Sequence, residues 1–168
     1  MTITRQEFRD AMARLGAAVN IITTDGPAGR GGFTASAVCS VTDEPPTLLI
    51  CMNRNATAAP RLKENGTVCV NVVTAAQKEA AMVFAGVTKC PMEERFLAGN
   101  WSRLATGAPA LDGAIESLDC RVAEIVEKGT HLVIFAEVAA VRFGKMDEAG
   151  LIYFDRDYHP VGAMAAGP

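Results

Sequence analysis

Apolar and small polar residues alternate along residues 33–41. An alternation of period two places successive side chains on opposite faces of an extended chain, so this segment predicts a half-buried strand. The acidic and proline-rich residues 43–46 predict a turn, because proline fixes φ and lacks an amide donor. Residues 47–52 follow as an apolar run of strand length, and residues 53–57 as a polar loop. The apolar face of the first strand comprises Phe33, Ala35, Ala37, Cys39 and Val41, and the other face Thr34, Ser36, Val38 and Ser40.

Four further strands are predicted by β-rich or alternating stretches. They cover residues 19–24, 67–73, 118–126 with a bulge-like break at its end, and 151–154. Residues 130–141 are nearly all apolar and predict a central strand buried on both faces. Residues 100–110 are expected to form a loop, and residues 156–161 a polar aromatic tail.

Three helices are predicted at the periphery. Thr4 and Glu7 have the spacing of a capping box, and Phe8, Met12 and Leu15 then share one apolar helical face that is expected to pack. Residues 58–65 and 74–84 predict two more helices. Together these elements predict one domain over residues 1–168, mainly β with peripheral helices and built as an antiparallel barrel.

Composition narrows the class of protein. The chain has 168 residues, 49% of them hydrophobic and 21% charged, which is typical of a globular domain and favours a homodimer. A net charge of −3 without a basic stretch argues against nucleic acid and anionic membranes as partners. Five scattered cysteines and two histidines lack disulfide or metal-site spacing, so a reducing compartment is expected. Because no apolar run reaches membrane length, we expect a cytoplasmic protein.

The hydroxyl-bearing face of the first strand is the first candidate site. Small side chains allow a planar ring to lie close to a backbone, and the polar loop at residues 53–57 precedes a helix and could accept a phosphate. The alternative interpretation is an ordinary solvent-facing strand, with Thr57 only capping the helix. Glycines at 29, 31 and 32 do not form a dinucleotide fingerprint, because a strand follows them.

Other candidate residues lie farther along the chain. His131 begins the apolar strand and could donate to a nucleotide, or could be structural. Phe84, Arg95 and Phe96 could flank a ligand or simply pack. The sequence shows no G-x-S-x-G motif and no strong acid–base pair, which favours chemistry supplied by a cofactor.

Five ordered blocks resemble the short-chain flavin reductases. They are FTASAVCSVTDEPPTLLICMN, the stretch from Asn53 to Val73, AGVTKCPMEERF, GTHLVIFAEV and GLIYFDRDYHPV. The likeness extends from about residue 9 to residue 161, and within the family it is to the reductase component of 4-hydroxyphenylacetate 3-monooxygenase and a pyrimidine-utilisation relative. It implies a split-barrel flavin-binding homodimer that uses NADH to reduce FAD or FMN for the oxygenase component of a two-component aromatic monooxygenase.

The resemblance also assigns residues to the cofactor site. The family's T-x-S strand and following loop match Thr34, Ala35, Ser36, Ser40, Asn53, Ala56 and Thr57, with Cys51 and Phe84 beside them. The family's Gly-Asp-His motif matches Gly129-Thr130-His131, with Thr in the middle position, and implies that His131 lies near NADH. The C-terminal segment near both nucleotides matches Tyr153, Arg156 and Tyr158. Two alternatives remain: a flavin carrier of the same fold without nicotinamide activity, and an interaction domain that binds no flavin.

Overall fold

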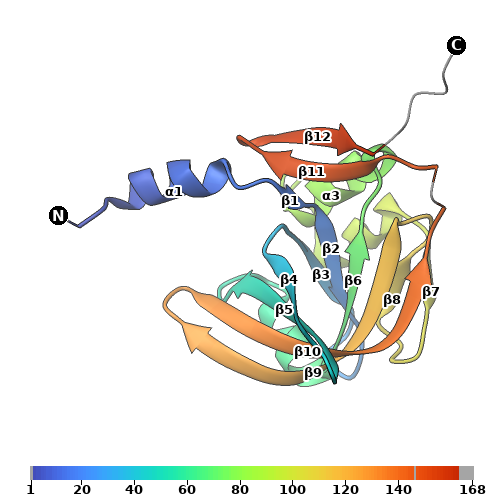
Figure 1. The fold of residues 1–168 in the computed structure, drawn as a ribbon. Coiled ribbons are helices and arrows are strands. Elements are labelled where there is room, and N and C mark those ends of the chain that lie inside the picture. Colours follow the sequence, from blue (N-terminus) through green and yellow to red (C-terminus); the bar gives the residue numbers. More distant parts are fainter. Residues whose placement is uncertain (1, 146, 163–168) are drawn as a thin grey trace, which may run out of the picture.

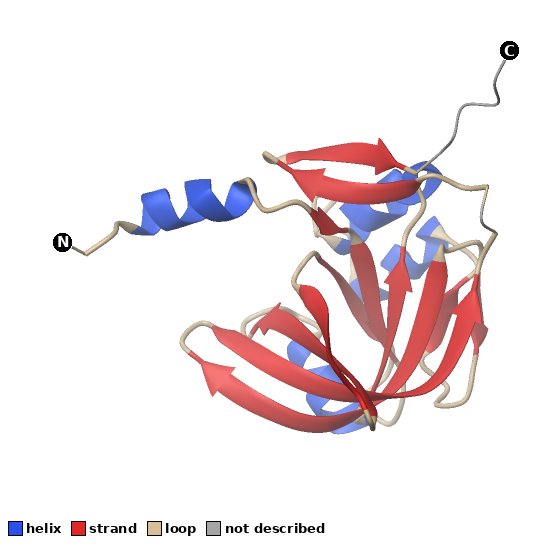
Figure 2. Cartoon of the chain, in the orientation of Figure 1, coloured by secondary structure: helices blue, strands red, loops and turns tan. Residues whose placement is uncertain are grey.

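The computed structural model describes residues 2–145 and 147–162, and most elements in it are strands (Figures 1 and 2). Met1, Met146 and residues 163–168 of the expected domain lie outside the described residues. The helices are α1 (Arg5–Ala13), α2 (Ala59–Asn65), α3 (Lys78–Phe84) and α4 (Met92–Arg95), with 3₁₀ turns η1 (Ala75–Gln77) and η2 (Phe96–Ala98). The strands are β1 (Ala17–Ala18), β2 (Asn20–Thr24), β3 (Gly31–Ala35), β4 (Val38–Asp43), β5 (Pro46–Asn53), β6 (Thr67–Val72), β7 (Trp101–Arg103), β8 (Pro109–Leu111), β9 (Glu116–Lys128), β10 (His131–Phe143), β11 (Gly150–Phe154) and β12 (Asp157–Val161).

Seven of these strands form one antiparallel sheet that curls back on itself. Its order is β3-β2-β6-β9-β10-β5-β4, so β3 and β4 are its two edges. Only Ser36 and Ala37 separate these edges along the chain. Since successive Cα atoms are about 3.8 Å apart, the end of β3 and the start of β4 lie within about 11 Å of each other. The described ladders join β3 only to β2 and β4 only to β5, so the curled sheet stays open at a seam between β3 and β4.

The prediction of one strand over residues 33–41 is wrong at this seam. β3 pairs with β2, whereas β4 pairs with β5. The chain changes partner across Ser36 and Ala37, and the alternation is reset there: Val38 packs against the core, while Ala37 and Cys39 are exposed. The alternation of apolar and polar residues in the sequence continues across Ser36 and Ala37, because the segments on both sides are strands. The alternation therefore did not reveal that the chain changes partner strand there.

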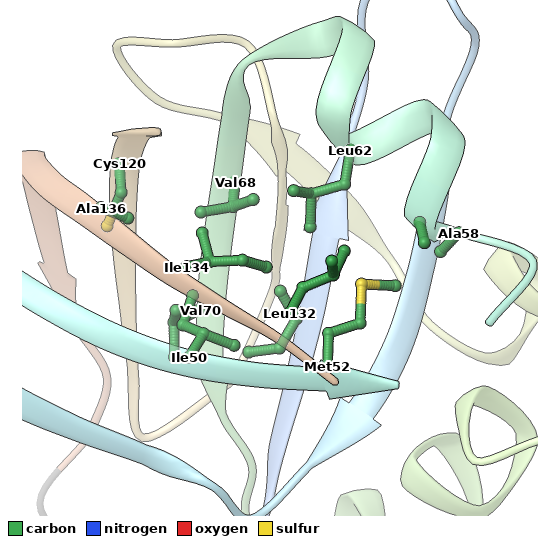
Figure 3. Packing of buried hydrophobic residues seen from close by; sticks show 12 residues of the cluster. Ile50, Met52, Ala58, Leu62, Val68, Val70, Cys120, Leu132, Ile134 and Ala136 are labelled. Atoms are coloured by element: carbon green, nitrogen blue, oxygen red, sulfur yellow. The ribbon is translucent and has the colours of Figure 1, made fainter. Parts of the chain in front are cut away.

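The interior of the curled sheet is filled by side chains from β5, β6, β10 and α2. Figure 3 shows Ile50 and Met52 of β5 on the same face of the sheet as Ile134 and Leu132, their partners on β10, with Leu62 of α2 above them. All five side chains are at most 1% exposed. Apolar burial of this kind is the main source of folding free energy. A second cluster lies outside the curl, around Phe84, Phe96 and Leu111.

β10 departs from the prediction that it is buried on both faces. Leu132, Ile134 and Ala136 are fully buried, but Glu137 and Val141, on the other face, are exposed. The single chain places no element over this outer face among the described residues. The predicted bulge at the end of the alternating stretch is confirmed, because Phe135 pairs with Glu124 and Ala136 with Val122, which leaves Ala123 of β9 without a partner in the ladder. A second shift, between Val138 and Ala140, was not predicted.

Two stretches predicted to be irregular form hairpins. β7 and β8 pair through Trp101 and Leu111, within the stretch predicted to be a loop. β11 and β12 pair through Tyr153 and Tyr158, where a polar tail was expected. The turn between β11 and β12 has positive φ at Asp155 and Arg156, a conformation that a hairpin loop of two residues needs but that Asn-Gly signals far better.

α1 forms as predicted but does not pack. The Glu7 amide donates to the Thr4 hydroxyl at 3.1 Å, and the Thr4 amide donates to the Glu7 carboxylate at 2.8 Å, which completes the capping box. Phe8 is nevertheless 53% exposed and Leu15 64% exposed. Figure 1 shows α1 projecting away from the sheet, and the described part of the chain buries none of its residues, so the expected packing of its apolar face is not found there.

Candidate functional site

A cavity of about 550 Å³ opens at the seam of the curled sheet. The end of β3 and the Ser36–Ala37 link form one side, and the end of β5 with the loop at residues 53–58 forms another. Phe84, Ala85 and Gly86 at the end of α3, together with Arg95 and His131, complete the lining. Much of this lining is glycine or alanine, which leaves room for a flat group to approach the backbone.

Nine of the predicted cofactor-site residues line this one cavity. They are Thr34, Ala35, Ser36, Cys51, Asn53, Ala56, Thr57, Phe84 and His131. They come from β3 and the link after it, from β5 and the loop after it, from α3 and from β10, which are segments far apart along the chain. Pairing of Asn53 with His131 across β5 and β10 brings two of these segments together, and a hydrogen bond of 2.9 Å from the Cys51 amide to the Ala37 carbonyl brings in the seam.

Thr34 joins the cavity wall to a helix. Its hydroxyl donates to the Ala81 carbonyl of α3 at 2.6 Å. A hydroxyl has one proton and two lone pairs, so the Thr34 oxygen can still accept a hydrogen bond from a ligand. Thr34 therefore acts first as a tie between β3 and α3, and any ligand contact through it is as an acceptor.

The loop after β5 is organised by Asn53. The Asn53 side-chain oxygen accepts from the Asn55 amide at 2.9 Å, and its carbonyl accepts from the Ala56 amide at 3.0 Å. The N-cap of α2 is Ala58, without a side-chain cap bond. The alternative interpretation that Thr57 merely caps this helix is therefore wrong. The Thr57 side chain is exposed in the cavity lining instead.

Phe84 forms a rigid apolar wall. It is 1% exposed, and its ring lies 5.1 Å from that of Phe96 and 5.5 Å from that of Trp101, between ring centroids. Gly32 allows this close packing, because a Cβ added there would stand 2.6 Å from Phe84 Cε1. An aromatic edge held in this way can shape a cavity but offers no polar contact.

Four predicted site residues lie outside the cavity. Ser40 is exposed on β4, beyond the seam. Arg156 forms an ion pair with Asp10 of α1. Tyr153 and Tyr158 pack edge to face with their ring centroids 5.1 Å apart. They border a separate cavity of about 230 Å³, which shares Thr34, Ala35, Ser36 and Ala85 with the first cavity. Burial raises the pKa of the Tyr158 phenol, so it is a neutral donor near pH 7.

His131 stands at the rim of the cavity. Its ring is exposed, and its Nδ1 lies 2.9 Å from the Thr130 hydroxyl. Thr130 occupies the middle position of the Gly-Thr-His segment, so here a hydroxyl rather than a carboxylate contacts the imidazole. This contact orients the ring and adds no negative charge at the rim.

Arg95 lines the cavity but was not among the residues predicted to form the cofactor site. Its Nη1 donates to the Phe84 carbonyl at 3.2 Å, which holds the guanidinium at the end of α3. The sequence predicted that Arg95 could flank a ligand or simply pack, and its position after the acidic pair of α4 did not decide between the two. Hydroxyls, small residues and one cation suit a flat ring with an anionic tail.

Comparison with known proteins agrees with this geometry. The family model described as "Flavin reductase like domain" matches residues 12–162. A protein named FMN reductase (NADH) RutF from Variovorax paradoxus (strain S110) is 57% identical over 159 residues, which are 95% of this chain and 87% of that protein. One of the same name from Yersinia enterocolitica is 55% identical over 161 residues, covering 96% and 87%.

One similar solved structure contains fragments of both nucleotides. The Streptomyces globisporus C-1027 NADH:FAD oxidoreductase SgcE6, in complex with NAD and FAD fragments, superposes with a TM-score of 0.82 at 27% identity. The match covers 92% of this chain and 91% of that chain. The curled sheet with its helices is thus an arrangement that a protein with bound flavin and nicotinamide fragments also has.

Proposed function

This chain belongs to the flavin reductase like domain family, and from that premise we propose that it uses NADH to reduce a flavin bound in the cavity at the seam. The observation that carries the proposal is that nine independently assigned cofactor-site residues line one cavity. The relatives named FMN reductase (NADH) support FMN as flavin and NADH as reductant. The NAD and FAD fragments in the SgcE6 structure support the same pair of nucleotide classes.

The residues of the chain bind and orient in this proposal. Small residues of β3 leave the flavin ring close to the backbone, and Phe84 limits how far it can slide. Asn53 shapes the loop that carries Thr57, which donates to the ribityl chain or phosphate. His131 at the rim orients NADH. When both nucleotides are bound, hydride passes from nicotinamide C4 to flavin N5, so positioning is the protein's main contribution.

The experiment is a steady-state assay of NADH absorbance at 340 nm with FMN or FAD added. We expect NADH loss that depends on added flavin and saturates with it. Absence of any flavin-dependent loss would refute the reductase. A protein that binds flavin but leaves NADH untouched would instead support the carrier alternative, and no fluorescence quenching on flavin titration would support the interaction domain.

We further propose that the reduced flavin leaves for a separate oxygenase. Ser36, Asn53, Asn55 and Thr57 are all exposed in the lining, so no described element covers the cavity and the flavin can exchange. More specifically, we propose that the partner is an aromatic monooxygenase, as in the 4-hydroxyphenylacetate subgroup. Hydroxylation by added candidate oxygenases, coupled to NADH oxidation, tests this.

We also propose that the open curled sheet is the split barrel of the family.

A cytoplasmic homodimer completes the proposal. Apolar side chains are exposed at Phe8 and Met12 of α1, at Leu15 just after it, and on the sheet at Val41 and Val126. Clustered exposed apolar residues are typical of association surfaces. Within the described residues, no helix has the length and hydropathy needed to cross a membrane. We propose that two copies bury these faces against each other.

A further inference from the structure

The turn between β9 and β10 places Thr130 beside His131 in a fixed geometry (Figure 1). Lys128 pairs with His131 across the hairpin, which leaves Gly129 and Thr130 as a turn of two residues. Gly129 has a φ of 58°, and a glycine with positive φ at the first position is typical of a type II′ hairpin turn. The Arg54 amide donates to the Thr130 carbonyl at 3.0 Å, so the turn is also held to the loop after β5.

The Thr130 hydroxyl contacts a single group. It lies 2.9 Å from His131 Nδ1, and it forms no other hydrogen bond among the described residues. Thr130 is outside the cavity lining, whereas His131 is part of it. Any effect of this hydroxyl on a ligand in the cavity therefore passes through the imidazole.

This contact makes the two ring nitrogens of His131 unequal. In a neutral imidazole one nitrogen carries the proton and the other accepts, and the hydrogen bond made by one of them sets which is which. A hydroxyl that donates to Nδ1 leaves the proton on Nε2. The nearby Asn53 side-chain oxygen, on the strand paired with β10, is already engaged by the Asn55 amide at 2.9 Å. Nε2 is thus the nitrogen left for a ligand.

A donor at Nε2 suits the nucleotide of the proposed function. The carboxamide carbonyl, ribose and pyrophosphate of NADH present acceptor oxygens, and a ring nitrogen without a proton would repel them. The carboxylate nearest the turn along β9, that of Glu127, lies 2.9 Å from Lys63 Nζ and is paired there. The Thr130 hydroxyl, rather than a carboxylate, therefore decides where the imidazole proton lies.

We propose that Thr130 is a positioning residue: its hydroxyl holds His131 in the tautomer with the proton on Nε2, and this N–H binds an acceptor oxygen of NADH. The second half rests on the proposed function, because it needs NADH at the rim, whereas the tautomer does not. An ionised Asp, as in the family's Gly-Asp-His motif, can only accept hydrogen bonds. In contact with Nδ1 it would keep the proton on that nitrogen, so the threonine of this chain reverses the tautomer.

NMR of the wild-type protein tests the tautomer directly. Long-range ¹H–¹⁵N correlation distinguishes protonated from unprotonated ring nitrogens, and the chain has only two histidines, so a His131→Gln spectrum assigns the signals. At a pH of about 8.5, where an ordinary imidazole is neutral, we expect the proton on Nε2 of His131, and a larger share on Nδ1 in Thr130→Val. A proton on Nδ1 in wild type, or identical spectra of the His131 ring in the two proteins, would overturn the proposal.

Steady-state kinetics test what the N–H does. Thr130→Val removes the hydroxyl and keeps the shape of the side chain. It should raise KM for NADH roughly two- to tenfold, as for the loss of one hydrogen bond, and leave kcat and KM for flavin within about twofold of wild type. Thr130→Ser should restore the wild-type KM. Thr42→Val is the matched control, since Thr42 is an exposed threonine outside the lining whose hydroxyl accepts only locally, from the Glu44 amide at 3.2 Å.

The same change in a His131→Gln background separates positioning from a merely structural role. A glutamine amide nitrogen donates whatever Thr130 does, because it has no tautomer to select. Thr130→Val should then change KM for NADH by less than about twofold. An equal rise in both backgrounds would show that Thr130 acts independently of His131 and would overturn the proposal. Absence of NADH oxidation in wild type would refute the proposed function, and the NMR measurement would still decide the tautomer.

Discussion

At the scale of single residues, the structure separates two hydroxyls that the sequence treats alike. Ser40 and Thr57 were both predicted as cofactor-site residues from the family resemblance, but only Thr57 lines the cavity. Ser40 lies on β4, where the chain has already changed partner strand. A seam of two residues, Ser36 and Ala37, decides which hydroxyls can reach a ligand.

Thr57→Ala should weaken flavin binding, and Ser40→Ala should not. The loss of one hydrogen bond from Thr57 costs about 0.5–1.5 kcal/mol, or roughly two- to tenfold in the dissociation constant. Titration of flavin fluorescence measures both variants. Equal weakening in the two would mean that β4 contributes to the site, and no change in either would exclude Thr57 from it.

His131→Ala should affect NADH more than flavin. The imidazole stands exposed at the rim, oriented by Thr130, while the flavin contacts lie deeper along β3 and the loop after β5. Steady-state kinetics should show a larger rise in KM for NADH than in KM for flavin. A larger effect on the flavin would assign His131 to the flavin instead.

At the scale of elements, the sequence predicted features that depend on neighbouring residues. It did not predict two features that depend on which strands pair or on what covers a sheet face. The capping box at Thr4 and Glu7 and the stop of α2 at Gly66 were predictable, because each depends on residues a few positions apart. The division at Ser36 was not, since alternation is the same on both sides of it. The outer face of β10 was assigned wrongly because apolar composition does not say what covers a face.

The candidate site was predictable in its residue types but not in its outline. Resemblance identified Thr34, Asn53 and Thr57, whose hydroxyl or amide chemistry stands out in the sequence. The wall formed by Phe84 depends on its contact with Gly32, 52 positions earlier in the chain, and no local pattern encodes that contact. β12 escaped prediction because its turn uses Asp155 and Arg156 at positive φ.

Gly32→Ala should destabilise the contact between β3 and α3. The added Cβ would stand 2.6 Å from Phe84 Cε1 and 2.9 Å from the Ile22 carbonyl oxygen, and the backbone atom cannot rotate away. We expect a loss of about 1–3 kcal/mol in the free energy of unfolding, measured by guanidinium denaturation. Gly31→Ala is the control, since its nearest contact, 3.3 Å from Arg61 Cδ, is a flexible side chain. Equal losses would show that space around Phe84 is not limiting.

At the scale of the whole molecule, the curl of the sheet creates the cavity, and the single chain leaves apolar faces uncovered. α1 is a helix of nine residues without a buried side chain. Isolated helices this short are marginal in water. A partner surface would stabilise it.

Analytical ultracentrifugation should therefore find wild type as a dimer. A Phe8→Ser and Leu15→Ser double variant should dissociate at higher protein concentration than wild type, because both side chains are apolar and exposed on the single chain. Far-UV circular dichroism controls for loss of fold. A monomeric wild type would refute the homodimer, and an unchanged double variant would exclude α1 from the interface.

The central claim is that the seam between β3 and β4 holds the flavin ring. A crystal structure of the protein grown with FMN tests it most directly. We predict the ring between β3 and the loop at residues 53–57, with Phe84 at its edge. A ring bound instead in the separate cavity that α1 lines together with Tyr153 and Arg156, or on the outer face of the sheet, would contradict the account.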